Sequence, residues 1–86
     1  MADVVVYTTS YCPYCTAAKG LLDRKGIAYT EVDVTGDIDE RLRLVERSGG
    51  RRTVPQIFID GESIGGYDEL VELDRAGRLD TVLAAG

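Results

Sequence analysis

A β-branched run followed directly by two closely spaced cysteines and a helical pattern constrains the fold of this chain more than any other feature. Residues 3–8 (DVVVYT) predict a buried strand, because short β-branched runs are typical of strands. From Pro13 onward apolar residues recur at helical spacing, and Gly26 stands where a helix C-terminal cap belongs. A strand, a turn and a helix therefore meet at Cys12.

A second strand and a second helix are expected next along the chain. Residues 27–34 (IAYTEVDV) alternate in the manner of a strand, and residues 37–48 have helical periodicity. Asp37 is the expected N-cap of this helix, and Gly49–Gly50 is its expected stop. The apolar residues that share one face of the helix are Ile38, Leu42 and Val45.

The second half of the chain predicts a hairpin and a third helix. TVPQIFI and SIGG flank Asp60–Gly61, a strong hairpin signal, so the third and fourth strands should be antiparallel. A helical pattern follows from Tyr67 to Gly77, and residues 79–85 are expected to add a short last turn. The order βαβαββα predicts an α/β fold: one mixed four-stranded sheet with helices on both faces, since βαβ crossovers are right-handed.

Composition limits the size and the partners of the protein. A length of 86 residues suits one small domain, so residues 1–86 are expected to form a single domain. The sequence contains neither a signal-like start nor an apolar run of about 18 residues, which predicts a cytoplasmic protein without a membrane partner. A net charge of −5 argues against nucleic acid as a partner.

The two cysteines, Cys12 and Cys15, leave three interpretations open: redox chemistry, metal binding or chance. A bridge between them closes too short a loop to stabilise the fold much. The absence of histidine removes the cysteine–histidine protease arrangement and most mixed zinc sites, and two cysteines cannot complete a closed zinc site, so no metal is expected unless a dimer shares it. A C-x-x-C motif after the first strand of such a pattern is typical of thioredoxin-like redox proteins.

Three motifs at these separations resemble the dithiol glutaredoxins: CPYC at 12–15, TVP at 53–55 and GGYDEL at 65–70. The resemblance covers nearly the whole chain. It implies a thioredoxin fold and glutathione-dependent reduction of protein disulfides and of glutathionylated proteins, by a monomer that uses glutathione as co-substrate and holds no bound cofactor. Many relatives carry a lysine where this chain has Thr9, so Arg51 or Arg52 is expected to meet the glycine carboxylate of glutathione.

The catalytic roles of the two cysteines follow from their places on the first helix. Cys12 stands at the exposed helix start, where the helix dipole and charge-assisted hydrogen bonds favour a thiolate. Cys15 lies one turn further in, toward the core. We therefore expect Cys12 to attack and Cys15 to resolve, with Cys15 needed only for the dithiol route.

The resemblance also implies a glutathione site. A cis Val54–Pro55 bond would turn the backbone of Val54 toward the cysteines, where glutathione could pair as an added strand. The start of the third helix would hold the γ-glutamyl carboxylate, and Asp68 would meet its amine. Without the resemblance, an edge-strand proline and a plain N-cap are the simpler interpretations. The residues expected to bind glutathione are Tyr14, Arg51, Arg52, Thr53, Val54, Pro55, Gly66, Tyr67 and Asp68.

The two other tyrosines near the motif are not part of this set. Tyr7 is expected in the core, and Tyr11 has no assigned role.

Two other functions stay open at this point. One is a redoxin that is reduced by thioredoxin reductase or that uses another low-molecular-weight thiol, although residues 65–70 favour glutathione. The other is a carrier that shares an iron–sulfur cluster between two protomers. Pro13 opposes the second alternative, because the rigid dithiol motif is seldom the cluster-binding variant of the family that the chain resembles.

Overall fold

The computed structural model describes residues 3–50 and 53–79, and its elements follow the expected order. The sheet order is β2-β1-β3-β4, with β1 parallel to β2 and with antiparallel pairing elsewhere. This arrangement confirms the mixed four-stranded sheet. The elements are β1 (Val4–Thr8), α1 (Pro13–Arg24), β2 (Thr30–Asp33), α2 (Ile38–Arg47), β3 (Gln56–Ile59), β4 (Glu62–Gly65) and α3 (Tyr67–Arg75).

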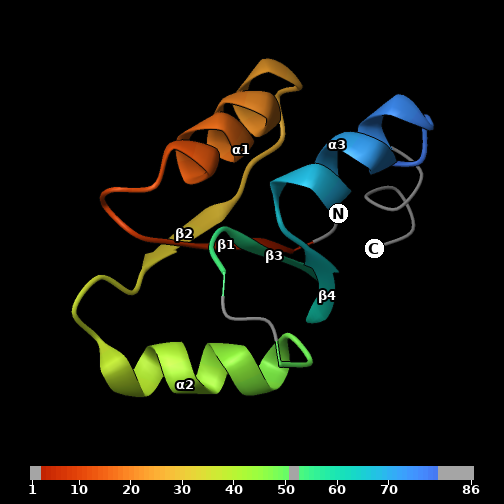
Figure 1. Cartoon of the computed structure of the whole chain (residues 1–86). Coiled ribbons are helices and arrows are strands. Elements are labelled where there is room, and N and C mark those ends of the chain that lie inside the picture. The colour runs from red at the N-terminus through yellow and green to blue at the C-terminus, as the bar shows by residue number, and fades with distance from the viewer. Residues whose placement is uncertain (1–2, 51–52, 80–86) are drawn as a thin grey trace.

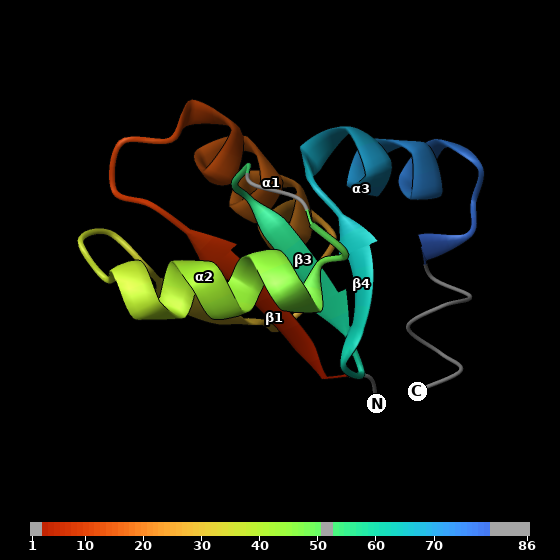
Figure 2. The same ribbon diagram turned by 60° about the horizontal axis from the view of Figure 1, so that its bottom comes forward.

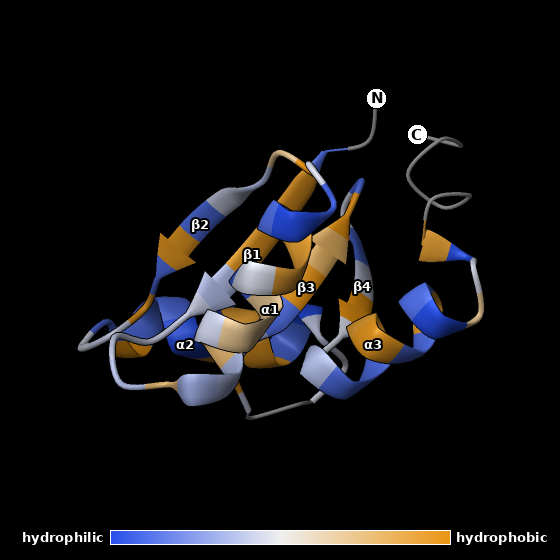
Figure 3. Cartoon of the chain, turned by 90° about the horizontal axis from the view of Figure 1, so that it is seen from above, coloured by the Kyte–Doolittle hydropathy of each residue, from blue (hydrophilic) through white to orange (hydrophobic). Residues whose placement is uncertain are grey.

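Helices cover both faces of the sheet. α1 and α3 lie side by side on one face, and α2 lies on the other (Figures 1 and 2). The central strands β1 and β3 carry most of the apolar residues of the sheet, whereas β2 is largely hydrophilic (Figure 3). Two buried clusters result, one under α1 and α3 and one under α2. Their members are Val4, Val6, Ala18, Leu21, Leu22, Ile57, Ile59, Leu70 and Leu79 in the first, and Tyr7, Val34, Leu44 and Phe58 in the second.

The end of α1 shortens the second strand. Gly26 adopts a φ of 69°, a left-handed conformation that suits glycine, and its N–H donates to the carbonyl of Asp23 at 3.1 Å. The N–H of Ile27 donates to the carbonyl of Leu22 at 2.9 Å. Because this amide closes the helix, it takes no part in the sheet, and pairing with β1 begins at Thr30. The expected strand over 27–34 was therefore too long.

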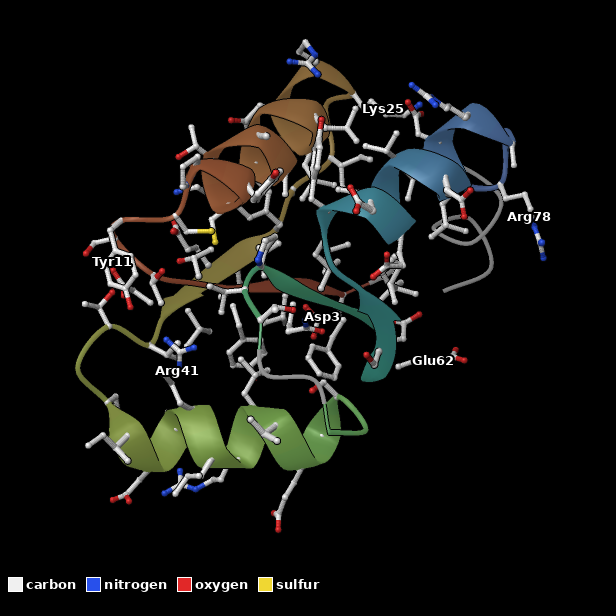
Figure 4. All side chains as sticks on the ribbon, viewed as in Figure 1. Asp3, Tyr11, Lys25, Arg41, Glu62 and Arg78 are labelled. Atoms are coloured by element: carbon white, nitrogen blue, oxygen red, sulfur yellow. The ribbon has the colours of Figure 1, made fainter. Side chains whose placement is uncertain are left out.

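The inner face of α2 differs from the apolar face that its sequence indicated. Asp37 caps the helix as expected, since its carboxylate accepts the N–H of Glu40 at 3.0 Å. Ile38 and Leu42, however, are 73% and 61% exposed, whereas Leu44 is buried against the sheet. Arg41 extends from α2 toward the sheet (Figure 4). Polar residues therefore share the inner face. Of the three apolar residues expected to share one face, Ile38 and Leu42 are exposed and Val45 is partly buried.

The β3–β4 hairpin turns at Asp60–Gly61, as predicted. Both residues have a positive φ, 53° and 81°, which is typical of a tight two-residue hairpin turn. The carboxylate of Asp60 also accepts the N–H of Asp3 at 2.8 Å. The hairpin pairs Ile57 with Gly65, which brings the segments before β3 and after β4 next to each other.

Two sequence-based expectations lie mainly or wholly outside the described residues. The short last turn over 79–85 is described only at Leu79, which is buried. Arg51 and Arg52 also fall outside the described ranges. Within residues 3–50 and 53–79, no helix combines the length and apolar character that a membrane crossing requires.

The packing of α2 can be tested with two leucines on that helix. Leu44→Ala should lower the free energy of unfolding by about 2–5 kcal/mol, because it removes a buried side chain from the core. Leu42→Ala, on the exposed face, should change it by less than about 0.5 kcal/mol. Chemical denaturation followed by circular dichroism measures both. Equal losses would show that α2 packs differently from this description.

Candidate active site

The sulfur of Cys12 lies at the N-terminus of α1, next to the loop before β3. Cys12 is the N-cap of the helix, and its Sγ accepts the backbone N–H of Cys15 at 3.1 Å. The thiol in turn donates to the carbonyl oxygen of Val54 at 3.5 Å. Both cysteines are free thiols, and Cys12 is partly exposed. A partly exposed sulfur that accepts a helix-terminal N–H is well placed to act as a nucleophile.

Cys15 has the opposite environment. It is 1% exposed and lies on the inner face of α1, which confirms its expected shielding. Burial, followed by a hydrogen bond with Cys12, raises the pKa of Cys15 to about 12, although the backbone N–H of Thr9 acts in the other direction. At neutral pH Cys15 therefore stays a protonated thiol next to the more accessible sulfur.

The loop before β3 places the carbonyl group of Val54 next to Cys12. The Val54–Pro55 peptide bond is cis, which confirms that expectation. Gln56, fully buried at the start of β3, donates from Nε2 to the carbonyl of Thr53 at 2.9 Å and to its Oγ1 at 3.4 Å. Sequence reasoning missed Gln56, although a glutamine opening the apolar run QIFI was an available signal. Its amide holds the loop that borders the thiols.

A groove of about 230 Å³ runs from this loop to the start of α3. Every expected binding residue that the structure describes lines it, and Glu69 is an additional lining residue. The rings of Tyr14 and Tyr67 flank it, with centroids 6.1 Å apart. The lining residues are Tyr14, Thr53, Val54, Pro55, Gly66, Tyr67, Asp68 and Glu69.

At its α3 end the groove is bordered by Gly66 and the first residues of the helix. Gly66 is the N-cap of α3 and has no side chain with which to cap the first turn, so the helix amides there can meet an anion. Its own N–H donates to Oε1 of Glu69 at 2.8 Å. A Cβ at position 66 would lie 3.2 Å from the carbonyl oxygen of Pro55. Glycine thus allows the start of α3 to approach the proline loop closely.

The other aromatic and polar residues near the motif differ in exposure. Tyr7 is buried, as expected, and its hydroxyl accepts a hydrogen bond from Arg47 at 3.0 Å. Tyr11 is 72% exposed and extends from the β1–α1 connection (Figure 4). Thr9 is buried, and its hydroxyl has no hydrogen-bond partner among the described residues. Thr9 therefore does not supply the positive charge that a lysine has at this position in many relatives.

Comparisons with known proteins agree on one family. The glutaredoxin family model matches residues 4–64. Glutaredoxin 3 of Escherichia coli K12 is 49% identical over 83 residues, which cover 96% of this chain and 99% of that protein. The solution structure of a Brucella melitensis glutaredoxin superposes with a TM-score of 0.85 at 47% identity, covering 96% of this chain and 89% of that one. A buckwheat glutaredoxin–glutathione complex superposes with a TM-score of 0.88 at 34% identity, covering 98% and 78%.

The contrast between the two sulfurs predicts their order of alkylation. With limiting iodoacetamide at about pH 6, Cys12 should be labelled before Cys15. In a Cys12→Ser variant, labelling of Cys15 should stay slow and keep rising with pH beyond 9.0, the ordinary pKa of this thiol, because burial, the largest cause that raises the pKa of Cys15, is still present. Mass spectrometry identifies the labelled residue, and the denatured chain is the control. Faster labelling of Cys15 than of Cys12 near pH 6 would reverse the assignment.

Proposed function

Since this chain belongs to the glutaredoxin family and is a glutathione-dependent thiol–disulfide oxidoreductase, we propose that Cys12 is its attacking thiolate and Cys15 its resolving thiol. The observation that carries this assignment is the difference between the two sulfurs. Cys12 is partly exposed and accepts the N–H of Cys15, whereas Cys15 is buried. Nucleophilic attack on a large disulfide substrate requires the accessible sulfur.

The proposed reaction has a monothiol route and a dithiol route. The Cys12 thiolate attacks the glutathione sulfur of a glutathionylated protein, so a Cys12–glutathione disulfide forms and the protein leaves as a thiolate. In the monothiol route, a second glutathione thiolate attacks that disulfide at the glutathione sulfur, forms glutathione disulfide and regenerates Cys12. In the dithiol route, Cys15 attacks the sulfur of Cys12 in a mixed disulfide with a substrate protein. A Cys12–Cys15 disulfide forms, and the substrate thiolate departs.

Glutathione is proposed to lie in the groove between the proline loop and α3. Its extended backbone would pair with Val54, and its sulfur would then lie near Cys12, whose thiol is 3.5 Å from the Val54 carbonyl. Its γ-glutamyl carboxylate would meet the amides at the start of α3, and Asp68 would meet the amine. Tyr14 and Tyr67 would flank the tripeptide. We assign the glycine carboxylate to Arg51 or Arg52, because Thr9 carries no charge.

We further propose that the chain works as a single-domain monomer with no bound cofactor. Electrons come from glutathione, and both cysteines must be reduced between turnovers. A reducing compartment such as the cytoplasm meets that requirement. The proposed substrates are exposed protein disulfides and glutathionylated proteins, because Cys12 is partly exposed at the protein surface.

The cysteine roles predict that the two activities separate in one variant. Cys15→Ser should keep most deglutathionylation activity, because external glutathione can release Cys12. It should lose most reduction of a protein disulfide, which needs attack by the second thiol. Cys12→Ser should lose both activities. A coupled assay with glutathione reductase measures each activity, and thioredoxin reductase serves as the comparison donor.

Two outcomes would overturn this assignment of roles. Equal loss of both activities in a folded Cys15→Ser protein would make Cys15 necessary for forming the Cys12 thiolate itself. Retention of activity in Cys12→Ser would place the nucleophile elsewhere. Circular dichroism of each variant shows whether it is folded.

The proposed role of Asp68 can be tested with a neutral replacement of nearly the same shape. Asp68→Asn should raise the KM for glutathione about two- to fivefold, as expected for the loss of one solvent-exposed charge contact. Glu72→Gln removes a carboxylate one turn further along α3, outside the groove lining, and should leave the KM unchanged. An unchanged KM in Asp68→Asn would remove this residue from the binding site.

A further inference from the structure

A polar network links α1 to the sheet one helical turn beyond Cys15. Lys19 Nζ lies 2.9 Å from Glu31 Oε2, and the hydroxyl of Thr8 donates to the same oxygen at 2.7 Å. Lys19 belongs to α1, Glu31 to the edge strand β2 and Thr8 to the end of β1. Residues four apart share a face of a helix, so Lys19 follows Cys15 along the face that packs on the sheet. The side chains of Lys19 and Glu31 are 28% and 39% exposed.

The resolving step requires Cys15 to ionise, and the environment of Cys15 opposes this ionisation. Cys15 must lose its proton before it can attack a disulfide, because the thiolate is the nucleophile. Burial opposes this ionisation, as do the hydrogen bond and the charge of Cys12, and together they raise the pKa of Cys15. Among the residues that the structure describes, the backbone N–H of Thr9 lowers this pKa, and the ammonium of Lys19 lowers it by a smaller amount.

Formation of the mixed disulfide changes this balance. Once the sulfur of Cys12 is bonded to a substrate, it has neither a negative charge nor a free thiolate with which to accept the Cys15 proton. Two of the influences that hold the pKa of Cys15 high are then removed, while Thr9 and Lys19 remain. Among the described residues, the other titratable groups that interact with Lys19 are Tyr29, Glu31 and Asp33, from β2 and the segment before it. The neighbouring strand β3 (Gln56–Ile59) has no titratable side chain to add.

We propose that Lys19, held in place by Glu31 and Thr8, is a positioning residue that stabilises the Cys15 thiolate during its attack on the Cys12 mixed disulfide. This inference rests on the proposed role of Cys15 as the resolving thiol. In the step, the Cys15 proton passes to solvent, the Cys15–Cys12 bond forms and the bond from Cys12 to the substrate sulfur breaks. The substrate sulfur leaves with the electron pair, and Lys19 keeps its proton throughout.

The ion pair stays charged over the pH range of the reaction. A hydrogen bond with Glu31 is the first cause that raises the pKa of Lys19. Hydrogen bonds from Lys19 and then Thr8 lower the pKa of Glu31. The lysine therefore acts as a fixed charge, and a change in its effect with pH reports on Cys15 and not on Lys19.

The first test measures Cys15 alone, in a Cys12→Ser background. Adding Lys19→Met should lower the rate of Cys15 alkylation at a given pH about two- to fivefold, the range expected for one partly exposed charge interaction. Lys19→Arg should restore the rate. If Lys19 only stabilised the fold, Lys19→Met would raise the alkylation rate instead, since a loosened helix exposes Cys15 and speeds its labelling. A faster or unchanged rate in Lys19→Met would overturn the proposal.

The chain offers a matched control for this substitution. Lys25 and Asp74 form a second ion pair near the other end of α1, at 2.6 Å and with side chains 27% and 30% exposed. Lys25, the C-cap residue just after α1, has a similar exposure. Adding Lys25→Met to the same background should leave the alkylation rate at the value of the Cys12→Ser protein. If both lysine variants slowed the reaction equally, the effect would reflect net charge, and the assignment to Lys19 would be wrong.

The second test measures the resolving step in the intact dithiol protein. Cys12 is first loaded with a small protein disulfide substrate, and release of the substrate thiol is followed in one turnover by acid quenching and mass spectrometry. Lys19→Met should slow release by the same factor as the alkylation. If Cys15→Ser also releases the substrate thiol without added glutathione, the proposed function fails. If Cys15→Ser blocks release while Lys19→Met releases at the wild-type rate, only the role of Lys19 is overturned.

Discussion

The hydrogen bond from the Cys15 N–H to the Cys12 sulfur, 3.1 Å long, joins the two chemical halves of the site. It requires Cys12 to be the N-cap of α1, which in turn requires the helix to begin at Pro13. The burial of Ala18 and Leu22 holds that helix on the sheet and fixes which cysteine points inward. The same packing that stabilises the fold therefore places two identical side chains in different environments, one partly exposed and one buried.

The groove depends on contacts between segments that are distant in sequence. The hairpin aligns the proline loop with the start of α3, and Gln56 supports the loop from within the sheet by its hydrogen bond to Thr53. At Gly66 the absence of a side chain allows the two segments to approach, because a Cβ there would crowd the Pro55 carbonyl. One buried amide and one glycine thus determine how closely the two sides of the groove approach each other.

The sequence was sufficient to predict those structural features that depend on neighbouring residues. The start of α1 at Pro13, its end near Gly26 and the turn at Asp60–Gly61 all follow from residues that favour one backbone conformation, and the resemblance to glutaredoxins is confirmed by the family comparison. The inner face of α2 could not be predicted, because Arg41 and other polar residues share it with Leu44.

One contact near the site that the sequence did not indicate joins two different segments. The ion pair between Lys19 and Glu31 connects a helix to a strand. The local sequence around each residue does not distinguish it from other charged surface residues. The partner that each of these charges finds depends on tertiary packing, which the local pattern of residues does not contain. The length of β2 was overestimated for a local reason, since the amide of Ile27 bonds to the carbonyl of Leu22 in α1 and not to the neighbouring strand.

The edge strand β2 is short and bears carboxylates at Glu31 and Asp33. An edge strand has unpaired backbone groups that can recruit a strand from another chain, and short length and charge are common protections against such pairing. A second copy of β2 that added here side by side would bring like charges together in a sheet, which is unfavourable. The short length of β2 and the charge of Asp33 thus oppose pairing of another chain with this edge of the sheet.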